Sequence, residues 1–173
     1  MRIEYLFTKS RNFKVGSSLI SWGTGKLHPQ LKPCSHVGLK LGPLIIESTL
    51  TSGVQIVPYL DWIKHQEVVY AFKCPTERKA IDVIDKVFKS SWGKSYDYLG
   101  ILYFTWRMLG FILFKRPLAR KNRWQSNKRY FCVEIIERIT GQSYQMTSPI
   151  QLVNTWKQEN LEEVDIKQYS IDK

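Results

Sequence analysis

Two alternating runs around Gly42-Pro43 constrain the fold of this chain more than any other stretch of the sequence. Alternation of apolar residues is typical of a strand with one buried face, and a two-residue turn between two such runs predicts a β-hairpin. With the turn at Gly42-Pro43, Leu41 pairs with Leu44, and the remaining pairs follow from that register. The face expected on the core consists of Val37, Leu39, Leu41, Leu44, Ile46 and Ser48.

The same register predicts a polar pair on the opposite face of the hairpin. His36 faces Thr49 and Gly38 faces Glu47, so His36 and Glu47 become diagonal neighbours across the two strands. Gly38 lies between them and is expected to leave space over the sheet, which makes it a candidate to line a substrate site. A histidine beside a carboxylate is a pair suited to acid–base chemistry.

A cysteine stands where a basic stretch gives way to a predicted amphipathic helix. From Cys132, isoleucines follow at spacings typical of one buried helical face, and Gly141 is expected to end the helix. These isoleucines are Ile135, Ile136 and Ile139. A thiol in the first helical turn lies at the positive end of the helix dipole, which favours the thiolate, and Lys128 and Arg129 act in the same direction. Alternatively, Cys132 is only the first member of the buried face.

Together these residues fit the requirements of thiol catalysis. A nucleophilic thiol needs a base within hydrogen-bond reach, and the base needs a group that orients it. Cys132 is the candidate nucleophile, His36 the base and Glu47 the orienting group, and the unpaired N–H of Cys132 is a candidate oxyanion donor. Spacing alone does not predict that the hairpin and the distant helix meet.

Six short motifs, taken in order, resemble one protein family. They are Ser35-His36-Val37-Gly38, Glu47, Val57-Pro58-Tyr59-Leu60-Asp61-Trp62-Ile63, Tyr96-Asp97-Tyr98, Phe131-Cys132-Val133-Glu134-Ile135 and Ser148-Pro149. Over about residues 15–155 they look like the circularly permuted branch of the NlpC-type, papain-like cysteine hydrolases. In that branch the histidine strand precedes the cysteine helix, whereas ordinary papain-like enzymes have the reverse order.

The resemblance implies an α+β fold, a papain-like small antiparallel sheet packed by helices, with no cofactor. It also implies Cys132 as nucleophile, His36 as base and Glu47 as orienting group, with Tyr96 or Tyr98 lining the site. The implied substrate is a peptide, another amide or an acyl compound, since relatives cleave cell-wall stem peptides, amides or acyl lipids. The chain departs from the family at Val133, where a small or hydroxyl residue is more usual, and in the length of the segment before Cys132.

That segment, an insert at about residues 99–129, is first apolar and then basic. Tyr98 to Phe114 is 17 residues with only Arg107 charged, and a bilayer span needs about 20 apolar residues. A buried core helix and a helix at a membrane interface both remain open. From Lys115 to Arg129 there are seven basic residues and no acidic one, which supply +7 of the net charge of +11. Candidate contacts to an anionic polymer or membrane are Lys115, Arg116, Arg120, Lys121 and Arg123, although a solvated loop has the same composition.

The length of 173 residues fits a single domain over residues 1–173. Three cysteines at irregular spacing predict neither a disulfide framework nor a metal site, and a reducing compartment is the simpler expectation. The N-terminus does not resemble a secretory signal, so the expected location is cytoplasmic or virion-associated. Two other functions stay open: a non-catalytic structural or membrane-associated component, for example of a virion, and nucleic-acid binding through the basic run, which no recognition motif supports.

The remaining elements follow from periodicity and capping signals. Strands are expected at residues 3–7, 54–57, 68–73 and 164–166, and helices at residues 58–63, 76–90 and 148–157. The stretch from Phe13 to Trp22 is expected to be a strand leading into a helix or turn, followed by a loop at Gly23-Thr24-Gly25.

Overall fold

The computed structural model describes residues 3–11, 15–74, 80–91, 93–97, 132–140 and 148–169, together with 102–103, 105–106, 109–110 and 113–115. Its strands are β1 (Ile3–Ser10), β2 (His36–Leu41), β3 (Leu44–Thr49), β4 (Gly53–Pro58) and β5 (Gln66–Lys73). Its helices are α1 (Val15–Leu27), α2 (Tyr59–Trp62), α3 (Ala80–Ser90), α5 (Cys132–Thr140), α6 (Pro149–Gln158) and the 3-10 turn η1 (Ile166–Tyr169). The part described is therefore α+β, with a small antiparallel sheet, as the sequence predicts.

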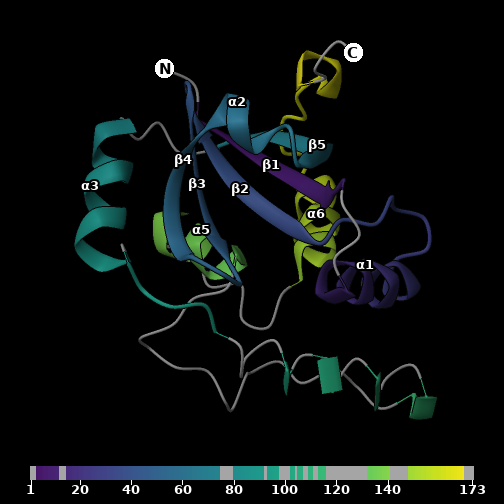
Figure 1. The fold of residues 1–173 in the computed structure, drawn as a ribbon. Coiled ribbons are helices and arrows are strands. Elements are labelled where there is room, and N and C mark those ends of the chain that lie inside the picture. The colour runs from purple at the N-terminus through teal and green to yellow at the C-terminus, as the bar shows by residue number, and fades with distance from the viewer. Residues whose placement is uncertain are drawn as a thin grey trace.

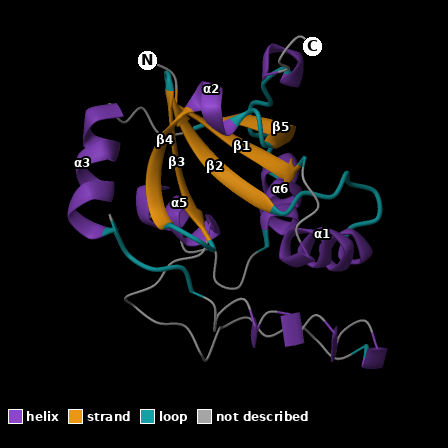
Figure 2. Ribbon diagram, viewed as in Figure 1, coloured by secondary structure: helices purple, strands orange, loops and turns teal. Residues whose placement is uncertain are grey.

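The five strands form one sheet in the order β4-β3-β2-β1-β5, and all neighbouring strands are antiparallel. Helices lie on both sides of this sheet (Figure 1). The helix α5 contacts β2 and β3, α3 contacts α5, and α2 lies against β3 and β4. Figure 2 shows the same arrangement, with the strands in orange between the purple helices.

The β2–β3 hairpin has the predicted register. Leu41 pairs with Leu44 and Leu39 pairs with Ile46, so the turn falls at Gly42-Pro43. Gly42 has a φ of 56°, in the left-handed region that glycine enters without the steric penalty of a side chain. The local sequence therefore determines the position of the turn and the face of the sheet on which each side chain of β3 lies.

Both faces of the sheet are buried, against two separate groups of side chains. The larger core joins four residues of the predicted apolar hairpin face, Val37, Leu39, Leu41 and Ile46, to Val133, Ile135 and Ile136 of α5 and to residues of α3 and α6. The smaller core lies on the opposite face and joins Ile45 to Leu6, Trp62, Ile63, Ala71 and Tyr169. His36 and Glu47 thus lie on a covered face of the sheet, beside the smaller core.

The predicted strand and loop between residues 13 and 25 are wrong where the structure describes them. The chain is helical from Val15 to Leu27, and this helix runs through Gly23, Thr24 and Gly25. The helix packs against β1 and α6, and a Cβ added to Gly25 would lie 3.6 Å from Pro33 Cβ. Tertiary packing of this kind overrides the low helical propensity of glycine.

The C-terminal part follows its sequence signals closely, except at its last strand. Ser148 caps α6 through a capping box, because its hydroxyl accepts from the N–H of Gln151 while the Gln151 side chain accepts from the Ser148 N–H. Instead of a strand at residues 164–166, a single bridge joins Glu163 to Phe72, and η1 follows. Among the described residues, no helix has the length and apolarity needed to cross a bilayer.

Candidate active site

His36 and Glu47 are in direct contact, as the hairpin register predicts. Nε2 of His36 lies 2.7 Å from Oε2 of Glu47. The histidine side chain is 16% exposed and the glutamate side chain 4% exposed, so the pair lies at the margin of the buried region with only the imidazole open to solvent. A carboxylate at Nε2 fixes the imidazole ring in one orientation and makes Nε2 the protonated nitrogen.

Two further side chains hold Glu47 in place, and sequence reasoning missed both. The indole Nε1 of Trp62 donates to Oε2 at 2.7 Å, and the amide Nε2 of Gln55 donates to Oε1 at 2.8 Å. Trp62 comes from α2, and Gln55 lies opposite Glu47 on β4. The cross-strand position of Gln55 follows from the β3–β4 register, which could have indicated it, whereas nothing in the sequence places the indole over this sheet face.

Cys132 is the first residue of α5, and its side chain lies close enough to His36 to raise the pKa of the imidazole. Because Glu47 engages Nε2, the imidazole nitrogen left for the thiol is Nδ1. Cys132 is buried and belongs to the larger core with Val133 and Ile135. Cys132 therefore begins the buried face of the helix, one of the two roles considered from sequence, and its role as a nucleophile stays a prediction.

The electrostatics of the pair favour two charged partners. Burial lowers the pKa of His36, but hydrogen bonds to Cys132 and Glu47 and their negative charges outweigh burial and raise the pKa of His36 to about 10. Burial raises the pKa of Glu47, yet the hydrogen bond and charge of His36, with the donors Trp62 and Gln55, leave it lowered. The imidazole is accordingly protonated near neutral pH, beside an ionised carboxylate.

A cleft of about 130 Å³ borders His36 at the end of the sheet where β1 and β3 finish and β2 and β5 begin. Tyr96 lines this cleft, in the position that the family resemblance implies for a site residue. The rest of the lining is polar but uncharged, apart from two aliphatic side chains. These residues are Ser10, Ile20, Ser35, Ser48, Thr49, Leu50, Thr51 and Gln66.

Gly38 does not border this cleft, contrary to the expectation of free space above it. A Cβ at this position would lie 3.1 Å from Ile45 Cγ2 and 3.3 Å from Trp62 Cζ2. The indole of Trp62 therefore occupies the space that the glycine leaves over the sheet. The absence of a side chain at Gly38 lets the indole reach Glu47, so the glycine contributes to the support of the carboxylate.

Several predicted residues lie outside the described part of the chain. Tyr98 is one, and the candidate anionic contacts Arg116, Arg120, Lys121 and Arg123 are the others. Lys115 is described and exposed.

The remaining cysteines differ from Cys132 in their surroundings. All three are free thiols. Cys34 is fully buried, and burial together with the nearby charge of Cys132 raises the pKa of its thiol. Cys74 is partly buried, and its sulfur lies 3.0 Å from the hydroxyl of Tyr5.

Within the described ranges, no group of three or more His, Cys, Asp or Glu side chains could hold a metal ion. Comparison with protein families, with curated proteins and with solved structures gave no match. Any assignment of function therefore depends on the chemistry of the site itself.

Proposed function

We propose that this protein is a cysteine hydrolase that cleaves an amide or ester bond through a thioacyl-enzyme. The observation that carries the proposal is His36, held between the carboxylate of Glu47 at 2.7 Å and the thiol of Cys132 at the start of α5. A nucleophile, a base and an orienting group in this order form the triad used for acyl transfer. The α+β sheet with the cysteine helix packed on β2 and β3 is compatible with the papain-like fold that we propose for it.

In the acylation step, Sγ of Cys132 attacks the carbonyl carbon of the substrate and forms a C–S bond. His36, protonated because its pKa is raised, donates its proton to the departing nitrogen or oxygen as the C–N or C–O bond breaks. The first-turn N–H groups of a helix have no intrahelical acceptor, so the N–H of Cys132 is available to the oxyanion of the tetrahedral intermediate.

Hydrolysis of the thioester completes the cycle. His36, now neutral, takes a proton from water while the water oxygen bonds to the acyl carbon, and the C–S bond breaks to release Cys132 as thiolate. Glu47 remains ionised throughout, because its role is to orient the imidazole and to stabilise its positive charge. The acid product leaves, and the protonated His36 is restored.

The decisive experiment measures acylation of the thiol with p-nitrophenyl acetate, a small activated ester that needs no specific recognition. We expect a burst of p-nitrophenolate, with an acetyl group on Cys132 in the intact-mass spectrum. Cys132→Ala is expected to abolish both signals. His36→Ala is expected to slow turnover by about 10²–10⁴-fold, the usual contribution of a general acid–base group.

Cys34→Ala and Cys74→Ala serve as matched controls, since each removes a thiol and leaves the triad intact. Both are expected to keep the burst and the label on Cys132. Equal acylation of all three cysteines in the native protein, or turnover that survives Cys132→Ala, would contradict the proposal. Absence of any acylation, in a protein that folds normally, would favour a non-catalytic component.

A further inference from the structure

The described residues between 102 and 114 have helical backbone and leave large apolar side chains in solvent. Leu102, Trp106, Leu109 and Leu113 follow one another at spacings of four, three and four, which is the sequence spacing typical of one face of a helix. They are 58%, 69%, 39% and 66% exposed, and Phe114 beside the last is 68% exposed.

Exposed apolar residues are ordinary when they are scattered, but a row on one helical face is not. Such a face exposes apolar area to water, and covering that area is favourable in free energy. The sequence alternatives for this stretch were a buried core helix and an interfacial helix. Leu102, Trp106 and Leu113 are exposed, which agrees with an interfacial helix and not with a buried core helix.

The charge around this face indicates what covers it. Between Tyr98 and Arg129 the sequence has no acidic residue, and the exposed Lys115 directly follows the apolar row. Six more basic residues come after it, up to Arg129. An apolar helical face with tryptophan, followed by a run of positive charge, is complementary to an anionic lipid surface, where the apolar side chains enter the acyl boundary and the cations meet the headgroups.

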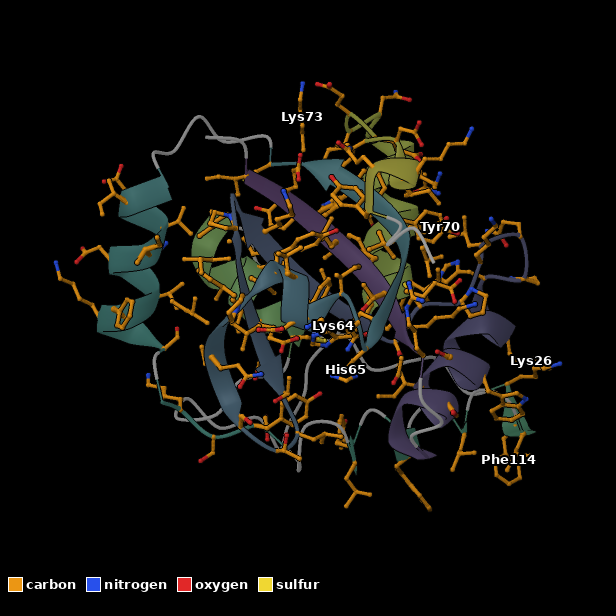
Figure 3. All side chains as sticks on the ribbon, turned by 45° about the horizontal axis from the view of Figure 1, so that its top comes forward. Lys26, Lys64, His65, Tyr70, Lys73 and Phe114 are labelled. Atoms are coloured by element: carbon orange, nitrogen blue, oxygen red, sulfur yellow. The ribbon has the colours of Figure 1, made fainter. Side chains whose placement is uncertain are left out.

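We propose that the apolar face formed by Leu102, Trp106, Leu109 and Leu113 docks this protein onto anionic lipid bilayers, lying in the interface without spanning it. Nucleic acid offers no comparable cover for leucine side chains, because its outer surface is charged phosphate. Figure 3 shows Phe114 on the same side of the molecule as Lys26 of α1, which is an exposed cation like Lys115.

Docking through this face goes beyond the thiol chemistry and does not require it.

The test is co-sedimentation of the full-length protein with vesicles of two compositions, phosphatidylcholine alone and phosphatidylcholine mixed with phosphatidylglycerol. We expect binding to the anionic vesicles that weakens as salt is raised, and little binding to the neutral ones. The triple variant Leu102→Ser, Trp106→Ser, Leu113→Ser is expected to bind anionic vesicles at least about tenfold more weakly, since it removes most of the inserted apolar area.

A matched control removes equally exposed apolar side chains elsewhere, through Leu60→Ser on α2 with Ile81→Ser and Phe88→Ser on α3. Leu60 is 71% exposed and Ile81 66% exposed, and α2 lies at the opposite end of the molecule in Figure 1 from the described helical pieces between residues 102 and 114. This control is expected to bind vesicles like the wild type.

Equal vesicle binding by the two triple variants, or self-association of the protein with no vesicle binding, would overturn the docking proposal. Binding to a short DNA duplex but not to anionic vesicles would assign the positive charge to nucleic acid and overturn it as well. Cys132→Ala is expected to bind vesicles like the wild type. A wild-type protein that binds anionic vesicles but shows no burst and no acetyl label on Cys132 would refute the hydrolase alone, and a wild-type protein that is acylated on Cys132 but does not bind vesicles would refute docking alone.

Discussion

Replacing Glu47 by glutamine removes one negative charge from the site while keeping nearly the same shape. The oxygen of the new amide can still accept from Trp62 and His36. The Gln55 side chain can turn its amide over, so that its oxygen accepts from the new NH2 group. Because this exchange leaves every buried polar group with a partner, we expect Glu47→Gln to fold and to report on charge.

The expected magnitude follows from the 2.7 Å contact between His36 and Glu47. Unit charges about 4 Å apart attract by about 4 kcal/mol at an effective dielectric constant of about 20. At about 1.36 kcal/mol per pH unit this energy corresponds to about three units, and neighbouring opposite charges in proteins usually act by about 1–3 units. Since the carboxylate favours the imidazolium, its loss lowers the pKa of His36, which is about 10 in the wild type.

The assay is a titration of the histidine rings by NMR, which needs no substrate and has only three histidines to resolve. We expect His36 to lose its proton about 1–3 pH units earlier in Glu47→Gln than in the wild type. The control is Glu4→Gln, which neutralises another buried carboxylate, one whose Oε2 lies 3.1 Å from Nζ of Lys40. It is expected to leave the His36 titration in place.

A wild-type His36 that titrates near its ordinary value of 6.5 would refute the reasoning, because the site would then not stabilise an imidazolium. The same conclusion would follow from an unchanged His36 titration in Glu47→Gln. A shift that Glu4→Gln reproduced would point to the net charge of the protein as the cause.

Three further predictions concern stability, each measured by urea unfolding. Trp62→Phe removes the donor 2.7 Å from Glu47 Oε2 and is expected to cost about 1–3 kcal/mol; a loss below about 0.5 kcal/mol would show that the indole N–H is dispensable. Gly38→Ala brings a methyl group 3.3 Å from the Trp62 ring and is expected to cost about 1–3 kcal/mol, whereas Gly110→Ala, with open space around it, is expected to be neutral or stabilising. Because the pKa of His36 is raised in the folded protein, its stabilising contribution is complete below about pH 6.5 and is lost as the pH rises through about 10. Because the pKa of Glu47 is lowered, its stabilising contribution is complete above about pH 4.5 and is lost in acid. The pair should therefore contribute most to stability between about pH 4.5 and pH 6.5. His36→Ala is expected to reduce the loss of stability on the alkaline side of the curve of unfolding free energy against pH.

Local patterns predicted much of this fold because they act over few residues. Alternation and the Gly42-Pro43 turn predicted the hairpin register, and with it the contact of His36 with Glu47. Capping signals predicted α6, and periodicity predicted the start of α5 at Cys132. The catalytic roles of these residues stay a prediction, which the acylation experiment tests.

The errors arose where contacts between distant segments decide the outcome. The glycines of α1 were interpreted as a loop, but packing against β1 and α6 keeps them helical. The space above Gly38 was expected to be open, but Trp62 fills it from another element. Neither a helix propensity nor a strand register contains such information, because both describe a segment without its neighbours.

The base, its orienting carboxylate and both donors to that carboxylate all come from residues 36–62, a short and continuous piece of chain. Contacts this close in sequence close small loops, which form at low entropic cost and early in folding. Cys132 must instead close a much longer loop before its thiol meets His36. We therefore expect His36 and its supporting side chains to assemble early in folding, and the thiol of Cys132 to join them only when the larger core forms around α5.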